Sequence, residues 1–169
     1  AHWESSTQMV SDVARYDTIH DFGGFPPELY RMQYPAPGDA ATAARVAELL
    51  QGAGVPFTVD RRRGLDHGAW VPLRRIYPEA AVPVVQMSVN PWAPPGAHYH
   101  IGRALAPLRR EGVMILASGG TIHNFATIRW DDPPEADAWA VAFDDWLLAR
   151  ITAWDLPALF DYEKQAPGA

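Results

Sequence analysis

The chain has 169 residues, of which 48% are hydrophobic, and this is enough for one soluble domain with a core. Its formal net charge of −6 disfavours nucleic-acid binding, and the absence of cysteine excludes disulfides, thiolate nucleophiles and cysteine-ligated metals. No apolar run approaches the ~20 residues that span a bilayer, and no signal peptide is visible, so we expect a cytoplasmic protein without membrane contact. The chain opens Ala1-His2-Trp3-Glu4 without Met, so we expect a fragment of a longer protein.

The first third of the chain is predicted to be loop-rich, with a short strand at 7–13. Asp39 is a candidate N-cap for a helix whose apolar residues recur at helical spacing up to Leu50, and Gly52 and Gly54 should end it. A β-prone run at 55–59 follows. A short helix at 72–77 should stop at a proline.

The rest of the chain alternates strand-like and helix-like segments. Buried strands are predicted at 82–89 and 113–118, and helices at 97–111, at 135–152 (strongly amphipathic) and at 156–164. Strands that alternate with helices predict an α/β fold, in which one largely parallel sheet is flanked by helices in a single domain.

Three of the six histidines lie where such a sheet would place a site. His123 follows the predicted strand 113–118, His67 follows the strand 55–59, and His2 opens the chain. Ligands of open α/β sheets bind beyond the carboxyl ends of the strands, so these three side chains could converge on one edge. A structural role for each remains the alternative.

The other histidines give weaker signals. His98 and His100 form a His-X-His pair, but residues i and i+2 at a helix start do not share a face, which disfavours metal binding. His20 lies in an aromatic loop and could line a pocket or be structural. Gly119-Gly120 lacks the pattern of a phosphate-binding loop and is interpreted as backbone room beside a site.

Several motifs occur together in a characteristic order. They are Ala1-His2-Trp3-Glu4, Ile19-His20-Asp21-Phe22-Gly23-Gly24-Phe25-Pro26, Leu65-Asp66-His67-Gly68-Ala69-Trp70, Pro83-Val84-Val85-Gln86-Met87-Ser88, Gly102-Arg103-Ala104-Leu105-Ala106-Pro107 and Ser118-Gly119-Gly120-Thr121-Ile122-His123-Asn124. With these motifs, nearly the whole chain resembles the 4,5-DOPA dioxygenase extradiol family of class III extradiol ring-cleaving dioxygenases, which is related to the catalytic subunit of protocatechuate 4,5-dioxygenase.

The resemblance implies a non-haem Fe(II) centre, or zinc as in some members, that takes a catechol-type substrate and O₂ and opens the ring to a semialdehyde. It implies that His2 is a metal ligand, that His123 is a ligand or the acid/base, and that His67 is an active-site residue near the substrate. As catalytic acid/base we expect His123 first and His67 second, and His67 could instead hydrogen-bond bound oxygen or the substrate hydroxyl. His20 and Asp66 are expected near the substrate, and Asp66 could orient His67 or only cap its loop. An imidazole with an ordinary pKa near ~6.5 suits the proton transfers.

The chain departs from the family pattern at both ends. The family's first His-Gly motif and its last His-Pro and Glu-His segment have no counterpart here, so we expect residues 1–169 to be the central part of one catalytic domain, inactive when isolated. A zinc-dependent hydrolase-like enzyme and a binding domain without activity are the alternatives. The sequence leaves the oligomeric state and the identity of the catechol open.

Overall fold

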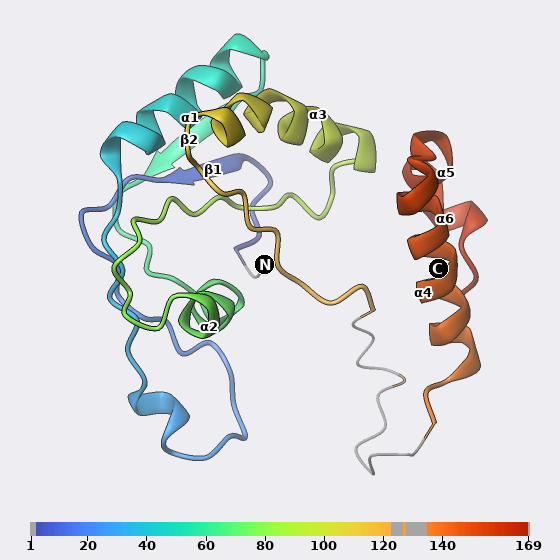
Figure 1. Cartoon of the computed structure of the whole chain (residues 1–169), viewed down its shortest axis with the longest axis horizontal. Coiled ribbons are helices and arrows are strands. Elements are labelled where there is room, and N and C mark those ends of the chain that lie inside the picture. The colour runs from blue at the N-terminus through green and yellow to red at the C-terminus, as the bar shows by residue number, and fades with distance from the viewer. Residues whose placement is uncertain (1–2, 123–126, 128–134, 169) are drawn as a thin grey trace. The chain divides into compact units, whose positions relative to one another are not determined.

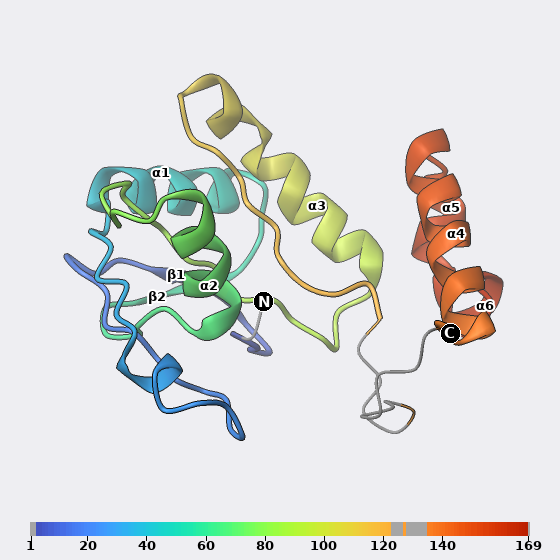
Figure 2. The ribbon, with the colours of Figure 1, turned by 60° about the horizontal axis from the view of Figure 1, so that its bottom comes forward.

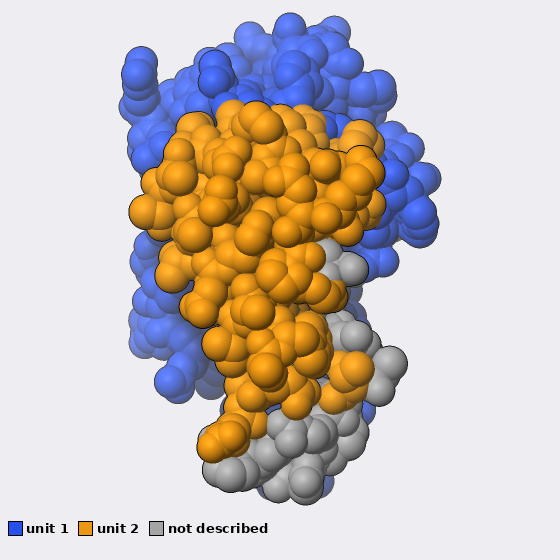
Figure 3. All heavy atoms as spheres, turned by 90° about the vertical axis from the view of Figure 1, so that its right-hand side faces the viewer, with its two compact units in different colours: residues 1–93, 97–119 blue, residues 94–96, 120–169 orange. Residues whose placement is uncertain are grey.

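The computed structural model describes residues 3–122, 127 and 135–168. The chain forms two compact units, which Figure 3 shows in different colours. Unit 1 comprises residues 1–93 and 97–119, and unit 2 comprises residues 94–96 and 120–169.

Unit 1 is built on a pair of parallel strands (Figure 1). Strand β1 (Gln8–Ser11) pairs with β2 (Phe57–Asp60) in a register that sets Gln8 opposite Phe57 and Ser11 opposite Asp60. Parallel pairing requires a crossover, and α1 (Ala40–Gly52) supplies it. The predicted α/β class and parallel pairing are confirmed.

Helix α1 begins where the sequence predicts. The Asp39 carboxylate accepts a hydrogen bond from the Thr42 amide at 3.0 Å, which satisfies one donor of the first turn. The buried face of the helix carries Val46 and Leu50, which pack with Val10 of β1 in one hydrophobic cluster. This cluster fixes α1 against the strand pair.

A second cluster surrounds α2 (His67–Ile76), which lies on the other side of the strand pair from α1 (Figures 1 and 2). It contains Trp70 and Leu73 of α2 together with Tyr16 and Tyr34 from the N-terminal loops. The helix begins five residues earlier than the sequence suggested, because Asp66 accepts a hydrogen bond from the Ala69 amide and acts as its N-cap.

The prediction of a buried strand at 82–89 is wrong in part. The segment runs beside β1, with Ser11 N donating to Gln86 O at 2.9 Å and Ser88 N donating to Met9 O at 3.1 Å, but it makes only isolated bridges. Serine hydroxyls explain why the pairing is interrupted. The Gln86 amide donates a hydrogen bond to Ser11 Oγ and the Met9 amide donates to Ser88 Oγ, so neither amide bonds to a carbonyl of the neighbouring segment.

The prediction of a buried strand at 113–118 is wrong. Among the described residues this segment pairs with no strand, and Met114, Ile115 and Leu116 are exposed. An apolar run in the sequence indicates only a propensity to form a strand. A strand also needs a neighbour whose backbone groups it can bond.

The predicted helix 97–111 is α3 (Pro95–Leu105) followed by the 3₁₀ helix η2 (Ala106–Arg110), so the regular helix stops just before Pro107.

Within unit 2 the helices are α4 (Ala138–Ala153), α5 (Leu156–Phe160) and α6 (Tyr162–Gln165). The sequence suggested that this helix is strongly amphipathic, and the structure shows that α4 is not. Its half-buried face carries aromatic residues, but Val141, Leu148 and Ile151 are apolar residues exposed outside that face. In the described part of the chain, no helix combines the length and the apolar character needed to cross a membrane.

Candidate functional site

Two loop segments of unit 1 meet and create the candidate site. Thr18 and Leu65 form a parallel bridge, in which Ile19 N donates to Leu65 O at 2.8 Å and Leu65 N donates to Asp17 O at 2.9 Å. The approach depends on Gly64, because a Cβ at this position would lie 2.5 Å from Asp17 O. The two segments therefore bring the residues after Ile19 beside the first residue of α2.

His67 and Asp21 pair at this junction. The Asp21 Oδ1 atom accepts hydrogen bonds from the backbone N–H of His67 at 3.0 Å and from its ring Nδ1 at 2.8 Å. Partial burial tends to raise the pKa of the Asp21 carboxyl, but the two hydrogen bonds from His67 outweigh this effect and hold the pKa below its ordinary value. Asp21 is therefore a carboxylate at neutral pH, and both side chains remain about 30% exposed (31% for His67 and 30% for Asp21).

An aromatic cluster adjoins this pair. The Phe22 ring stands edge-on to the His67 ring, with centroids 5.6 Å apart and an interplanar angle of 89°. Phe22 also contacts His20 at 5.9 Å and Tyr30 at 5.1 Å. The geometry around Phe22 is typical of aromatic packing, and it leaves His67 at the edge of an apolar, aromatic surface.

His20 lies inside the aromatic cluster, as its loop position suggested. Its Nε2 atom is hydrogen-bonded to the carbonyl of Met32 at 2.9 Å, and its ring contacts Trp70 with centroids 5.9 Å apart. The indole N–H of Trp70 donates to Ile19 O at 3.0 Å, which holds the loop against α2. His20 is thus a half-buried part of the wall, and contact with a substrate remains a prediction.

Asp66 has a different place from the one expected beside a substrate. It is completely buried, with 0% exposure, and its Oδ2 atom accepts from Arg63 and from Gln86, each at 3.0 Å. Its Oδ1 atom caps α2 at Ala69. These contacts give the Asp66 side chain a structural role in unit 1. Of the two roles expected for Asp66, capping is the one that the structure shows, and the carboxylate hydrogen-bonded to the His67 ring is that of Asp21.

The buried carboxylate also connects two of the sequence motifs. The Arg63 guanidinium, which pairs with Asp66, lies over the ring of Trp3 at 5.0 Å from its centroid. Trp3 is itself buried and directly follows His2, while Asp66 directly precedes His67. Arg63 thus contacts the immediate neighbours of two histidines that lie 65 positions apart.

Two of the predicted site residues, His2 and His123, lie outside the described residues. The convergence of His2, His67 and His123 therefore stays a prediction. Within residues 3–122, 127 and 135–168, no group of three His, Asp or Glu side chains is arranged to hold a metal ion.

The His-X-His pair is engaged elsewhere. His98 Nε2 is hydrogen-bonded to the Asn90 carbonyl at 2.8 Å, and His100 Nε2 to the Ala53 carbonyl at 3.0 Å. Both residues link segments through these hydrogen bonds.

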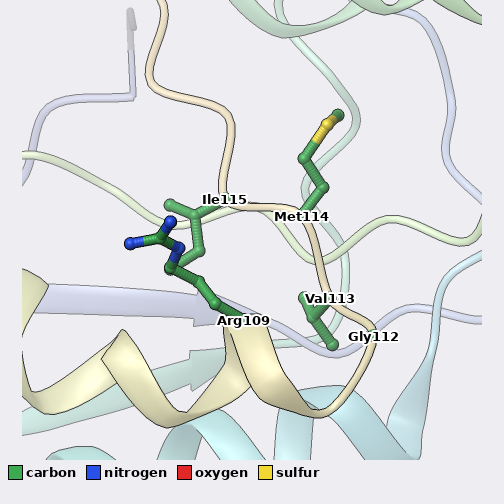
Figure 4. A pocket seen from close by; sticks show the side chains of 5 residues that line it. All are labelled: Arg109, Gly112, Val113, Met114 and Ile115. Carbon is green, nitrogen blue, oxygen red and sulfur yellow. The ribbon is translucent and has the colours of Figure 1, made fainter.

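A surface hollow of about 700 Å³ lies at another place in unit 1 (Figure 4). Arg109 and residues 112–115 line it, and among these described residues Arg109 alone has a titratable side chain. It offers no acid–base pair comparable to Asp21 and His67.

Comparison with known proteins identifies the family. Residues 1–169 match the family described as the catalytic LigB subunit of aromatic ring-opening dioxygenase. The chain belongs to this family. It is 45% identical over 171 residues to a protein of Beta vulgaris named 4,5-DOPA dioxygenase extradiol, covering 99% of this chain and 62% of the relative. A protein with the same name from Escherichia coli is 43% identical over 158 residues, covering 93% of this chain and 57% of the relative.

A solved structure has a similar fold. A crystal structure of an uncharacterized protein from Escherichia coli K12 matches 99% of this chain with a TM-score of 0.80 and 35% identity, and the match covers 64% of that chain. This LigB-family chain thus spans less than two thirds of the length of the curated relatives named above.

For this LigB-family chain, sequence reasoning missed Asp21. The residue lies in the quoted motif Ile19-His20-Asp21-Phe22, so an acidic side chain next to a candidate pocket histidine was a usable signal. The pairing itself was not visible, because Asp21 and His67 are 46 residues apart and meet only through the Thr18–Leu65 bridge.

Proposed function

We propose that this chain supplies the central part of the catalytic domain of a non-haem iron extradiol dioxygenase. The proposed enzyme inserts both atoms of O₂ into a DOPA-like catechol and opens the ring to a semialdehyde. Family membership over residues 1–169 supports the reaction class, and the names of the Beta vulgaris and Escherichia coli relatives support the substrate class. The pairing of His67 with a carboxylate at an aromatic edge is the structural observation that carries the proposal.

The donor chemistry of the chain fits the proposed metal. Because the sequence has no cysteine, imidazole and oxygen ligands are the ones it can offer, and these suit Fe(II) and also Zn(II). We assign His2 and His123 as candidate ligands. The contact of Arg63 with both Trp3 and Asp66 supports one part of this proposal, that the segment after His2 belongs to the same site as the segment before His67. When bound, the metal would bring the catechol and O₂ together and pass electron density between them.

The residues of the chain would bind the ring and move its protons. The aromatic cluster around Phe22 offers ring edges and faces against which a catechol can pack. With Nδ1–H donated to Asp21, the His67 ring would carry its acceptor lone pair on Nε2, which could take a proton from a catechol hydroxyl and return it later. His123 is the alternative acid/base, and His67 would then hydrogen-bond the substrate.

The test uses this chain and a hybrid protein in which the chain replaces the matching region of the Beta vulgaris relative. Each protein is loaded anaerobically with Fe(II) or Zn(II) and mixed with DOPA and ¹⁸O₂. We expect a yellow product that contains two ¹⁸O atoms, formed by the iron-loaded hybrid. His67→Ala should lower turnover at least about 100-fold, as expected for loss of an acid–base group.

His100→Ala is the matched control, because His100 is an exposed histidine of α3 whose Nε2 atom is hydrogen-bonded to the Ala53 carbonyl, away from Asp21 and His67. It should leave turnover unchanged. If the folded hybrid cleaves no DOPA after loading with Fe(II), and none after loading with Zn(II), this result would contradict the proposed reaction. Near-normal turnover by the His67→Ala hybrid would remove His67 from the mechanism.

A further inference from the structure

The two hydrogen bonds between Asp21 and His67 do different things. The bond to the His67 backbone fixes where the first residue of α2 lies, and the bond to Nδ1 fixes how its ring is turned. Both end on one oxygen, Oδ1, so a single carboxylate determines the position of the main chain and the orientation of the side chain. This requires that Nδ1 carries the proton, because a carboxylate is only an acceptor.

Phe22 adds a second restraint on the same ring. Its ring meets the His67 ring at 89°, and it is the residue next to Asp21. One short loop segment therefore holds an edge of the imidazole through Asp21 and packs against the ring through Phe22. Rotation about the side-chain torsions of His67 would break both contacts.

Capping of α2 does not account for Asp21. The N-cap of this helix is Asp66, whose Oδ1 accepts the Ala69 amide at 3.1 Å. Asp21 accepts a hydrogen bond from the His67 amide in the first turn. Its second hydrogen bond, to the His67 ring, contributes nothing to the helix. The ring contact is therefore a feature of the site rather than of helix initiation.

From this arrangement we propose that Asp21 is a positioning residue: it holds His67 as the Nδ1–H tautomer and leaves Nε2 as the proton acceptor that the reaction uses. The role in the reaction rests on the proposed function above. The tautomer and the ring orientation follow from the geometry of unit 1. A carboxylate in this position also stabilises the imidazolium that forms when Nε2 takes up a proton.

The test is a long-range ¹H–¹⁵N correlation spectrum of the histidine rings in the metal-free 169-residue chain at a pH where His67 is neutral. The signals of His67 are identified by their loss in His67→Ala. We expect the native chain to show the Nδ1–H tautomer. Asp21→Ala should shift His67 towards the Nε2–H tautomer, which an unrestrained histidine side chain favours, and Asp21→Asn should retain part of the native preference because its Oδ1 still accepts.

Glu28→Ala is the matched control. Glu28 is an exposed carboxylate of the same loop region that pairs with Arg31, and its loss should leave the His67 tautomer unchanged. Backbone amide spectra of each variant show that the fold persists. If Asp21→Ala does not fold, Asp21→Asn provides the comparison. A native Nε2–H tautomer overturns the proposal, and so does a tautomer ratio that Asp21 substitution leaves unaltered.

Kinetics of the hybrid protein separate positioning from binding. Asp21→Ala should lower kcat about 10- to 100-fold with little change in KM, in the range found when a hydrogen-bonded partner of a functional histidine is removed. A rise in KM alone would overturn the role in proton transfer. Absence of ring cleavage in the unsubstituted hybrid would count against the proposed function, while the tautomer measurement would still decide whether Asp21 orients His67.

Discussion

The Gly64→Ala substitution tests how the candidate site is assembled. A Cβ at this position would lie 2.5 Å from Asp17 O, whereas ordinary van der Waals contact begins at 3.4 Å, so the two segments would have to separate by about 1 Å. The flanking hydrogen bonds, Ile19 N to Leu65 O at 2.8 Å and Leu65 N to Asp17 O at 2.9 Å, would then leave the hydrogen-bonding range. Two such bonds correspond to about 1–3 kcal/mol of the free energy of unfolding.

The assay is urea denaturation of the chain, with Gly52→Ala as the control for the same change of side chain. Gly52 is the last residue of α1 and a Cβ there would meet nothing within 4 Å, so the control should be neutral or stabilising by up to about 1 kcal/mol. Gly64→Ala should also weaken the preference of His67 for one tautomer, since the bridge places Asp21 beside it. Equal free energies of unfolding for the two variants would refute the steric argument.

Three further substitutions probe single contacts. Trp70→Phe removes the indole N–H that donates to Ile19 O at 3.0 Å and should lower the free energy of unfolding by about 1–3 kcal/mol; an unchanged urea midpoint would show that this bond is dispensable. Asp39→Ala removes the N-cap of α1 and should lower the free energy of unfolding by about 0.5–2 kcal/mol, with a parallel loss of helical circular dichroism on heating. The pKa of Asp21 is lower in the folded chain than its ordinary value of 3.8, so its contribution is present above that pH and is lost as the pH falls through the folded-state pKa. The stability difference between the native chain and Asp21→Asn should accordingly narrow in acid titrations below pH 3.8, and a difference that stays constant would show that the contact with His67 is not charge-assisted.

Much of the local structure was predictable because it depends on neighbours in the sequence. The Asp39 cap reaches only to Thr42, and the apolar spacing of α1 is set within one helix. The α/β class followed from the alternation of segments. The two apolar runs at 82–89 and 113–118 were overestimated as strands, because strand formation depends on partners that the run itself does not specify.

Of the residues that form the candidate site, the sequence identified His67 but not its partner Asp21. His67 was assigned from the Asp-His-Gly motif, and it does lie beside an aromatic surface and a carboxylate. Of the two roles expected for Asp66, the structure shows capping, because at a helix start the N-cap side chain bonds to the first-turn amides. A contact between Asp66 and a substrate stays a prediction. The roles predicted for His2, as a metal ligand, and for His123, as a ligand or the acid/base, stay hypotheses for the hybrid-protein experiments.

The sequence by itself determined the family, the presence of the main helices, the Asp39 cap of α1, and His67 as a candidate site residue. These properties depend on residue type and on spacings of a few residues. Only the tertiary structure decided that Asp21 holds His67 and that Asp66 is buried against Arg63 and Gln86. The physical reason is that such contacts require distant segments to meet in one register, and here the approach of two backbones at Gly64 sets that register.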